Sequence, residues 1–145
     1  MIAPTQKNIL IVEDDQDVAG YMAKALEEIG HRIMAVFSTA EEAMEKAQQS
    51  PHPDLVIMDV TLAGAFDGIH AGKYIESHLN LPVLYITGCS NNAVSLEKEG
   101  RVPLIKPFTP KELKTAIDVV FYIISAKNTP RKIPAPQKPD LNLSN

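Results

Sequence analysis

The sequence predicts an α/β fold built on a parallel sheet, and two observations carry that prediction. Five short apolar runs alternate along the chain with five stretches whose apolar residues recur at helical spacing. The runs lack the polar alternation of a half-exposed strand, so each is expected to be a strand buried on both faces. Strands that alternate with helices are joined by right-handed crossovers and therefore run parallel.

The first strand is expected at Asn8–Val12, and the helix after it should end at Gly30, a residue type common at helix C-termini. The second strand is expected at Arg32–Phe37. Ser38 and Thr39 each precede a glutamate by three residues, which is the capping-box spacing and marks the start of the second helix.

The second half of the chain repeats the pattern. Pro103 falls within the fifth predicted strand and lacks an amide N–H, so this strand is expected at an edge of the sheet. Thr109 and Pro110, followed by Glu112, have the spacing of a helix cap with proline in the first turn. The predicted elements before that helix are strand Leu55–Met58, helix Gly68–Leu79, strand Pro82–Ile86, a weak polar helix Asn91–Glu99 and strand Val102–Ile105.

The length of 145 residues favours one domain. Near residue 127 the composition changes, because prolines appear among polar residues with no periodic apolar face. Such a segment cannot bury enough apolar surface to order itself. The sequence therefore predicts a disordered N-terminus at residues 1–7, a folded domain at 8–126 and a proline-rich disordered tail at 127–145.

Composition excludes several classes of protein. The net charge of −4 argues against direct DNA binding, which needs clustered basic residues. The single cysteine, Cys89, rules out an intrachain disulfide and is typical of a reducing compartment. No apolar run approaches the roughly 20 residues that span a membrane, and residues 1–7 are too short and polar for a signal peptide. We therefore expect a cytoplasmic protein with no membrane or nucleic-acid partner.

Polar side chains that could react or bind a ligand follow four of the five predicted strands. In open α/β sheets, ligands bind at the carboxyl ends of the strands. One acid at such a position is usually a helix cap or a solvated loop residue, whereas a set at four strand ends predicts a site. The set is Glu13, Asp14 and Asp15 after strand one, Asp59 after strand three, Thr87 after strand four and Lys106 after strand five.

These residue types suit phosphoryl transfer to a carboxylate. Crowded acids repel one another unless a hard cation lies among them, and Mg²⁺ prefers oxygen ligands. Asp59 can act as the nucleophile and form an acyl phosphate. Lys106 and the metal would neutralise the transferring group, and the Thr87 hydroxyl would hydrogen-bond a phosphate oxygen.

The strand ends together resemble the receiver domain of two-component response regulators, over about residues 8–126. The resemblance implies a single flavodoxin-like sheet of five parallel strands in the order 2-1-3-4-5, with five helices. That order places strand five at an edge. The matching segments are Ile9–Asp15, Pro53–Asp59, Asp67-Gly68, Pro82–Gly88 and Lys106–Phe108.

The resemblance also implies residue roles. Asp59 would be the phosphoacceptor. Asp14 would ligate Mg²⁺ directly, Glu13 mainly through water, and the backbone carbonyl of Thr61 would supply a further ligand beside Asp59. In the same way, Thr87 and Lys106 would hold the phosphoryl oxygens.

Two functions within this family remain open. The first is a stand-alone receiver, not an enzyme, that takes a phosphoryl group from a sensor histidine kinase or histidine phosphotransfer protein. It would then relay the phosphate or switch a surface for a downstream protein. The second is a degenerate receiver that binds proteins without phosphate. The complete set of acceptor-site residues argues against it, but Pro103 keeps it open, because receivers usually have an aromatic switch residue there. The chain also resembles a receiver subgroup that lacks this residue.

Two functions outside this family fit less well. A phosphatase of the haloacid dehalogenase type needs a second acid two residues after the nucleophile, where this chain has Thr61. An FMN carrier needs donors in the first loop, where this chain has acids. The apolar run Phe121–Ile124 is wider than one helical stripe, which leaves open either a homodimer or partner surface or cover by the tail.

Overall fold

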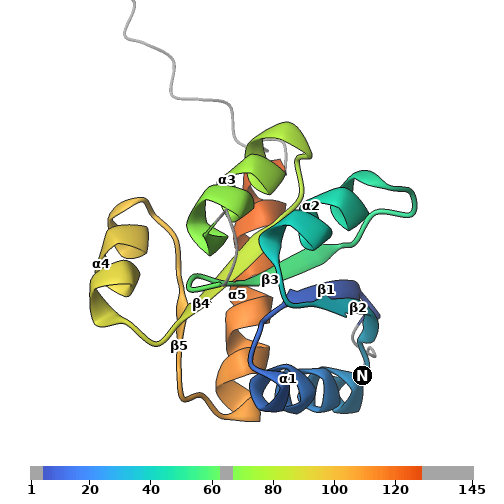
Figure 1. The fold of residues 1–145 in the computed structure, drawn as a ribbon, viewed down its shortest axis with the longest axis horizontal. Coiled ribbons are helices and arrows are strands. Elements are labelled where there is room, and N and C mark those ends of the chain that lie inside the picture. Colours follow the sequence, from blue (N-terminus) through green and yellow to red (C-terminus); the bar gives the residue numbers. More distant parts are fainter. Residues whose placement is uncertain (1–4, 63–66, 129–145) are drawn as a thin grey trace, which may run out of the picture.

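Strands and helices alternate along the whole described chain (Figure 1). The structure, a computed structural model, describes residues 5–62 and 67–128. The strands are β1 (Asn8–Val12), β2 (Arg32–Phe37), β3 (Leu55–Asp59), β4 (Val83–Thr87) and β5 (Leu104–Ile105). The helices are α1 (Gln16–Ile29), α2 (Ala40–Gln48), α3 (Gly68–His78), α4 (Ser90–Lys98) and α5 (Pro110–Asn128).

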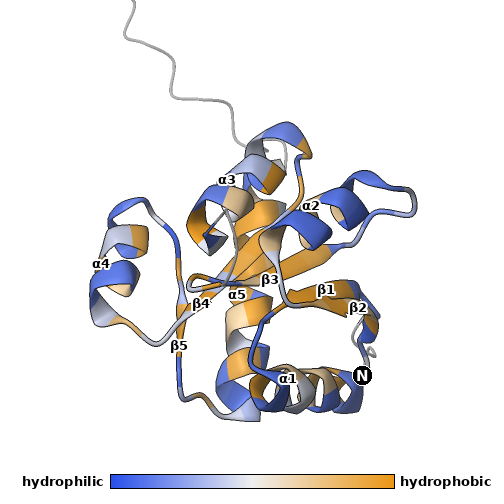
Figure 2. Ribbon diagram, in the orientation of Figure 1, coloured by the Kyte–Doolittle hydropathy of each residue, from blue (hydrophilic) through white to orange (hydrophobic). Residues whose placement is uncertain are grey.

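The five strands form one parallel sheet in the order β2-β1-β3-β4-β5, which confirms the expected topology. Consecutive residues of each central strand point to opposite faces. Ile9 and Ile11 of β1 pack with α1 and α5, whereas Leu10 and Val12 pack with α2 and α3. Both faces are therefore covered, which explains why these strands are nearly continuous apolar runs in the sequence and appear mostly hydrophobic in Figure 2.

The predicted helix signals have their expected contacts. Gly30 ends α1 with φ +113°, a left-handed conformation that favours glycine. Of the two candidate caps for α2, Thr39 is the N-cap, and its hydroxyl accepts a hydrogen bond from the Glu42 N–H. Thr109 and Glu112 form a reciprocal capping box at the start of α5.

The prediction for the fifth strand was wrong in its first half. β5 contains only Leu104 and Ile105, which pair with Ile86 and Thr87. Its position at the sheet edge is confirmed, but Pro103 precedes the strand and is not a ladder residue. The edge position therefore follows from the strand order of the fold.

Helices α4 and α5 are present with boundaries close to those predicted. The weak helix expected at Asn91–Glu99 is present as α4, although its N-cap, Cys89, makes no side-chain capping bond. Helix α5 runs to Asn128, two residues into the segment predicted as tail. The rest of that tail, residues 129–145, and residues 1–4 of the predicted N-terminal segment lie outside the described residues.

Within residues 5–62 and 67–128, no helix combines the length and the apolar character needed to cross a bilayer.

Candidate functional site

Three acidic side chains meet at the carboxyl ends of β1 and β3, which are neighbours in the sheet. Glu13 follows β1, and its N–H donates to the Phe37 carbonyl at 2.9 Å, so the loop is held where β1 ends. Glu13 and Asp59 are buried, at 1% and 3% exposure, whereas Asp14 is exposed. Carboxylate oxygens of the three residues lie within 4.8 Å of one another.

Lys106 brings a positive charge to this acidic cluster from the end of β5. Its Nζ lies 2.7 Å from Glu13 Oε1 and 3.2 Å from Asp59 Oδ2. Its backbone N–H donates to the Thr87 carbonyl at 2.9 Å, which fixes the lysine beside β4. In the described part of the chain Lys106 is the cation that contacts the cluster, so three carboxylates face one ammonium.

Backbone amides complete the shell of the two buried carboxylates. The Thr61 N–H donates to Asp59 Oδ1 at 3.1 Å, and the Asp15 N–H donates to Glu13 Oε2 at 3.2 Å. Asp15 itself is the N-cap of α1, where its Oδ1 accepts hydrogen bonds from Asp17 and Val18, and it is not one of the three clustered carboxylates. The contact to Thr61 is made by its amide, and its carbonyl as a metal ligand stays a prediction.

The electrostatics of the cluster reflect this excess of negative charge. Burial and the hydrogen bond with Asp59 together raise the pKa of Glu13 to about 7, while Lys106 acts in the opposite direction. Burial lowers the pKa of Lys106, but its pairs with Glu13 and Asp59 outweigh burial and raise it above the usual range. An oxygen-rich, negatively charged cluster whose Asp14 is exposed fits a hard divalent cation such as Mg²⁺.

The Thr87 hydroxyl lies at the end of β4, the strand next to β3, and is fully buried. Its Oγ1 accepts a hydrogen bond from the Cys89 N–H at 3.0 Å and donates to the Cys89 carbonyl at 3.4 Å. The donated bond is longer than the usual O–H···O range of about 2.5–3.0 Å and is therefore weak. The hydroxyl proton is therefore available to a better acceptor at this end of the sheet.

Gly68 supports the site through a contact that was not predicted from the sequence. Its N–H donates to the Val60 carbonyl at 3.1 Å. A Cβ added at Gly68 would lie 1.8 Å from the carbonyl oxygen of Asp59. The start of α3 thus packs directly on the backbone of the predicted phosphoacceptor, and a glycine directly after the α3 cap Asp67 was the available signal.

The parallel sheet and the cluster of Glu13, Asp14, Asp59 and Lys106 at its edge define a receiver domain. Comparison with known protein families gives the same class. The family model described as "Response regulator receiver domain" matches residues 9–118. The chain belongs to this family of response regulator receiver domains, which act in two-component signalling.

Individual relatives show how much of the chain is shared. The phyllosphere-induced regulator PhyR of Methylorubrum extorquens is 30% identical over 129 residues, which cover 88% of this chain and 48% of PhyR. The response regulator receiver protein CpdR of Brucella abortus is 32% identical over 118 residues, covering 77% of this chain and 94% of CpdR. The chain thus spans about half the length of PhyR and nearly all of CpdR.

Solved structures show the same fold. The signal receiver domain of a modulated diguanylate cyclase from Desulfovibrio desulfuricans G20 has a TM-score of 0.76 and 26% identity, covering 86% of this chain and all of that chain. The response regulator PhyR from Brucella abortus has a TM-score of 0.74 and 25% identity, covering 85% of this chain and 51% of that chain.

Proposed function

We propose that this receiver accepts a phosphoryl group on Asp59, with Mg²⁺ held by Glu13, Asp14, Asp59 and the carbonyl of Thr61. The observation that carries the proposal is the position of the Asp59 carboxylate. It lies 3.2 Å from the Lys106 ammonium and within 4.8 Å of two further carboxylates. A carboxylate placed between a fixed cation and a cation-binding cluster suits attack on a phosphorus atom.

The reaction forms one bond and breaks one bond. An Asp59 oxygen bonds to phosphorus as the bond between phosphorus and the histidine nitrogen of the donor breaks, and the released imidazole takes a proton from solvent. Lys106 would bind a phosphoryl oxygen, and the Thr87 hydroxyl would donate to another in place of the 3.4 Å bond to Cys89. Bound Mg²⁺ would supply further neutralisation of the phosphoryl charge.

The donor in this proposal is a sensor histidine kinase or a histidine phosphotransfer protein, and the chain acts in the cytoplasm. The output is a relay of phosphate or a surface for a downstream protein, with no direct DNA contact. On α5, Phe121 packs against the core, whereas Tyr122 is 74% exposed. The exposed ring suits contact with a partner or with a second copy of the chain.

Intact-protein mass after incubation with acetyl phosphate and Mg²⁺ tests this function. We expect a phosphoryl adduct on the wild type that requires Mg²⁺ and is absent from Asp59→Asn. Asp118→Asn removes an exposed acid on α5 and should leave the adduct unchanged. A wild type that folds but gains no adduct, with Mg²⁺ at millimolar concentration, would instead support the phosphate-independent binding module.

A further inference from the structure

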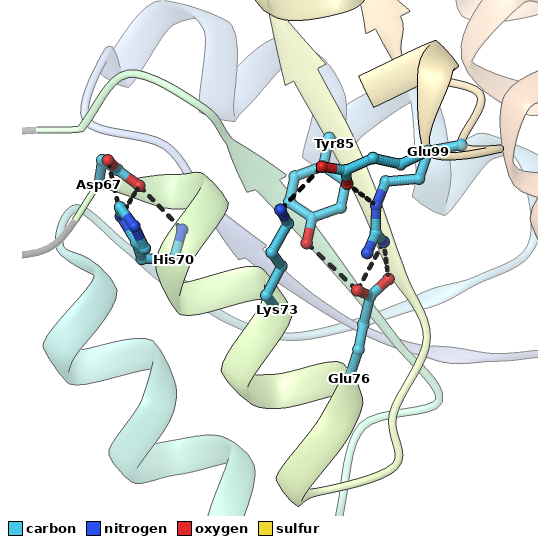
Figure 3. Close-up of polar contacts among 7 residues, drawn as sticks. Asp67, His70, Lys73, Glu76, Tyr85 and Glu99 are labelled. Atoms are coloured by element: carbon cyan, nitrogen blue, oxygen red, sulfur yellow. Dashed lines mark hydrogen bonds and ion pairs between the residues drawn. The ribbon is translucent and has the colours of Figure 1, made fainter. Parts of the chain in front are cut away.

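Four charged side chains of alternating sign join α3 to the turn after α4 (Figure 3). Lys73 Nζ lies 2.9 Å from Glu99 Oε2, and Glu99 Oε1 lies 2.9 Å from Arg101 Nε. Arg101 then hydrogen-bonds both carboxylate oxygens of Glu76 through Nη1. We call this set, Lys73, Glu99, Arg101 and Glu76, the charge row.

The charge row rests on a buried aromatic ring. The guanidinium carbon of Arg101 lies 5.2 Å from the centre of the Tyr85 ring, within the range of a cation–π contact. The Tyr85 hydroxyl donates to Glu76 at 3.4 Å, and Gly72 leaves the space it needs, since a Cβ there would lie 2.4 Å from the hydroxyl oxygen. Tyr85 belongs to β4, so the row connects α3, α4 and the central sheet.

Helix α4 has few other ties to the domain. Its buried residues are Ala93 and Leu96, and its N-cap Cys89 makes no side-chain capping bond. In Figure 1 it lies at the margin of the molecule, beside β5. Gly88 precedes it in open space, since a Cβ added there would have no heavy atom within 4 Å, and Gly100 follows it with φ +83°. Two glycines therefore bracket a helix with a small apolar anchor.

We propose that the charge row is an ionic latch that fixes the C-terminal end of α4 against α3, and that opening it lets α4 move as a unit about Gly88 and Gly100. The other end of α4 follows Thr87 by three residues, so the latch restrains the segment that leaves the site. The latch needs no phosphoryl transfer and forms in the protein without metal or phosphate.

The strength expected of the latch follows from its partial burial. The side chains of Arg101 and Glu76 are each 26% exposed, and those of Lys73 and Glu99 are 44% and 41% exposed. Isolated surface ion pairs contribute little, but several charges joined in one partly buried network contribute more. The hydrogen bonds from Lys73 and Arg101 lower the pKa of Glu99, in line with mutual stabilisation of these charges.

Amide hydrogen exchange of the full chain, without Mg²⁺, tests the latch. In Arg101→Gln we expect the amides of α4 to exchange about tenfold faster than in the wild type, while the amides of β1 and β3 keep their rates. Raising NaCl to about 1 M, where the Debye length falls to about 3 Å, should bring the wild type toward the variant. The variant itself should respond little to salt.

Lys114→Gln is the matched control, because it removes a cation from an exposed ion pair that lies within α5 alone. Equal α4 exchange in Arg101→Gln and the wild type would overturn the latch, and so would an equal rise in β1 and β3. If Arg101→Gln does not fold, Glu99→Gln and the salt titration of the wild type give the same readout. Loss of phosphorylation at Asp59 would leave each of these outcomes unchanged.

Discussion

Replacing Gly68 with alanine is expected to lower the free energy of unfolding by about 3 kcal/mol, at the upper end of the cost of overpacking. The added Cβ would lie 1.8 Å from the Asp59 carbonyl oxygen, 2.7 Å from its carbonyl carbon and 2.9 Å from the Cα of Val60. All three atoms belong to the backbone, so no side chain can rotate away. Helix α3 and the end of β3 must therefore move apart, and this displaces the backbone of Asp59. Urea denaturation followed by circular dichroism measures the effect.

Gly20→Ala is the control for this substitution. Gly20 lies exposed in the interior of α1, and a Cβ there would have nothing within 4 Å. Alanine at such a position should raise the free energy of unfolding by about 0.5–1 kcal/mol, because glycine loses more backbone entropy in a helix. A Gly68→Ala variant with the urea midpoint of the wild type would show that α3 does not need this close approach.

Asp14→Asn is expected to weaken Mg²⁺ binding by about 100-fold, since losing even a residue that supports a metal ligand costs about 10- to 100-fold. Asp14 is the exposed member of the acidic cluster, so the change removes a negative charge without opening the core. Removing that charge also relieves repulsion, and the variant should therefore be more stable than the wild type in EDTA. Thermal unfolding with and without Mg²⁺ measures both effects, because a ligand of the folded state raises Tm.

Asp15→Asn separates coordination from general negative charge. Asp15 is also exposed and adjacent in sequence, but its Oδ1 caps α1 by accepting from the Asp17 and Val18 N–H groups. Asparagine caps helices equally well, so this variant should fold normally and keep most of its Mg²⁺ affinity. If both variants lower the Mg²⁺ affinity equally, the affinity depends on the net charge of the loop and Asp14 is not a ligand.

Much of the fold could be predicted from local patterns. Apolar runs, caps and C-terminal glycines depend on neighbours in sequence, so the starts of α2 and α5 and the end of α1 are where their signals indicated. β5 was predicted too long, because its length depends on how far the chain stays beside β4, which is a tertiary contact. Of the two residues wrongly included in the strand, Val102 is of a type common in strands, and only Pro103 is not.

The candidate site, too, could be predicted from the sequence only in part. The sequence by itself determined which residues end the strands, and parallel strands necessarily bring those ends to one edge, so Glu13, Asp59 and Lys106 meet there. Only the tertiary structure decided the contacts made across elements: the approach of Gly68 to Asp59, and the reach of Arg101 to Glu76, 25 residues away. The physical reason is that such contacts depend on how whole helices pack on the sheet, which no local pattern encodes.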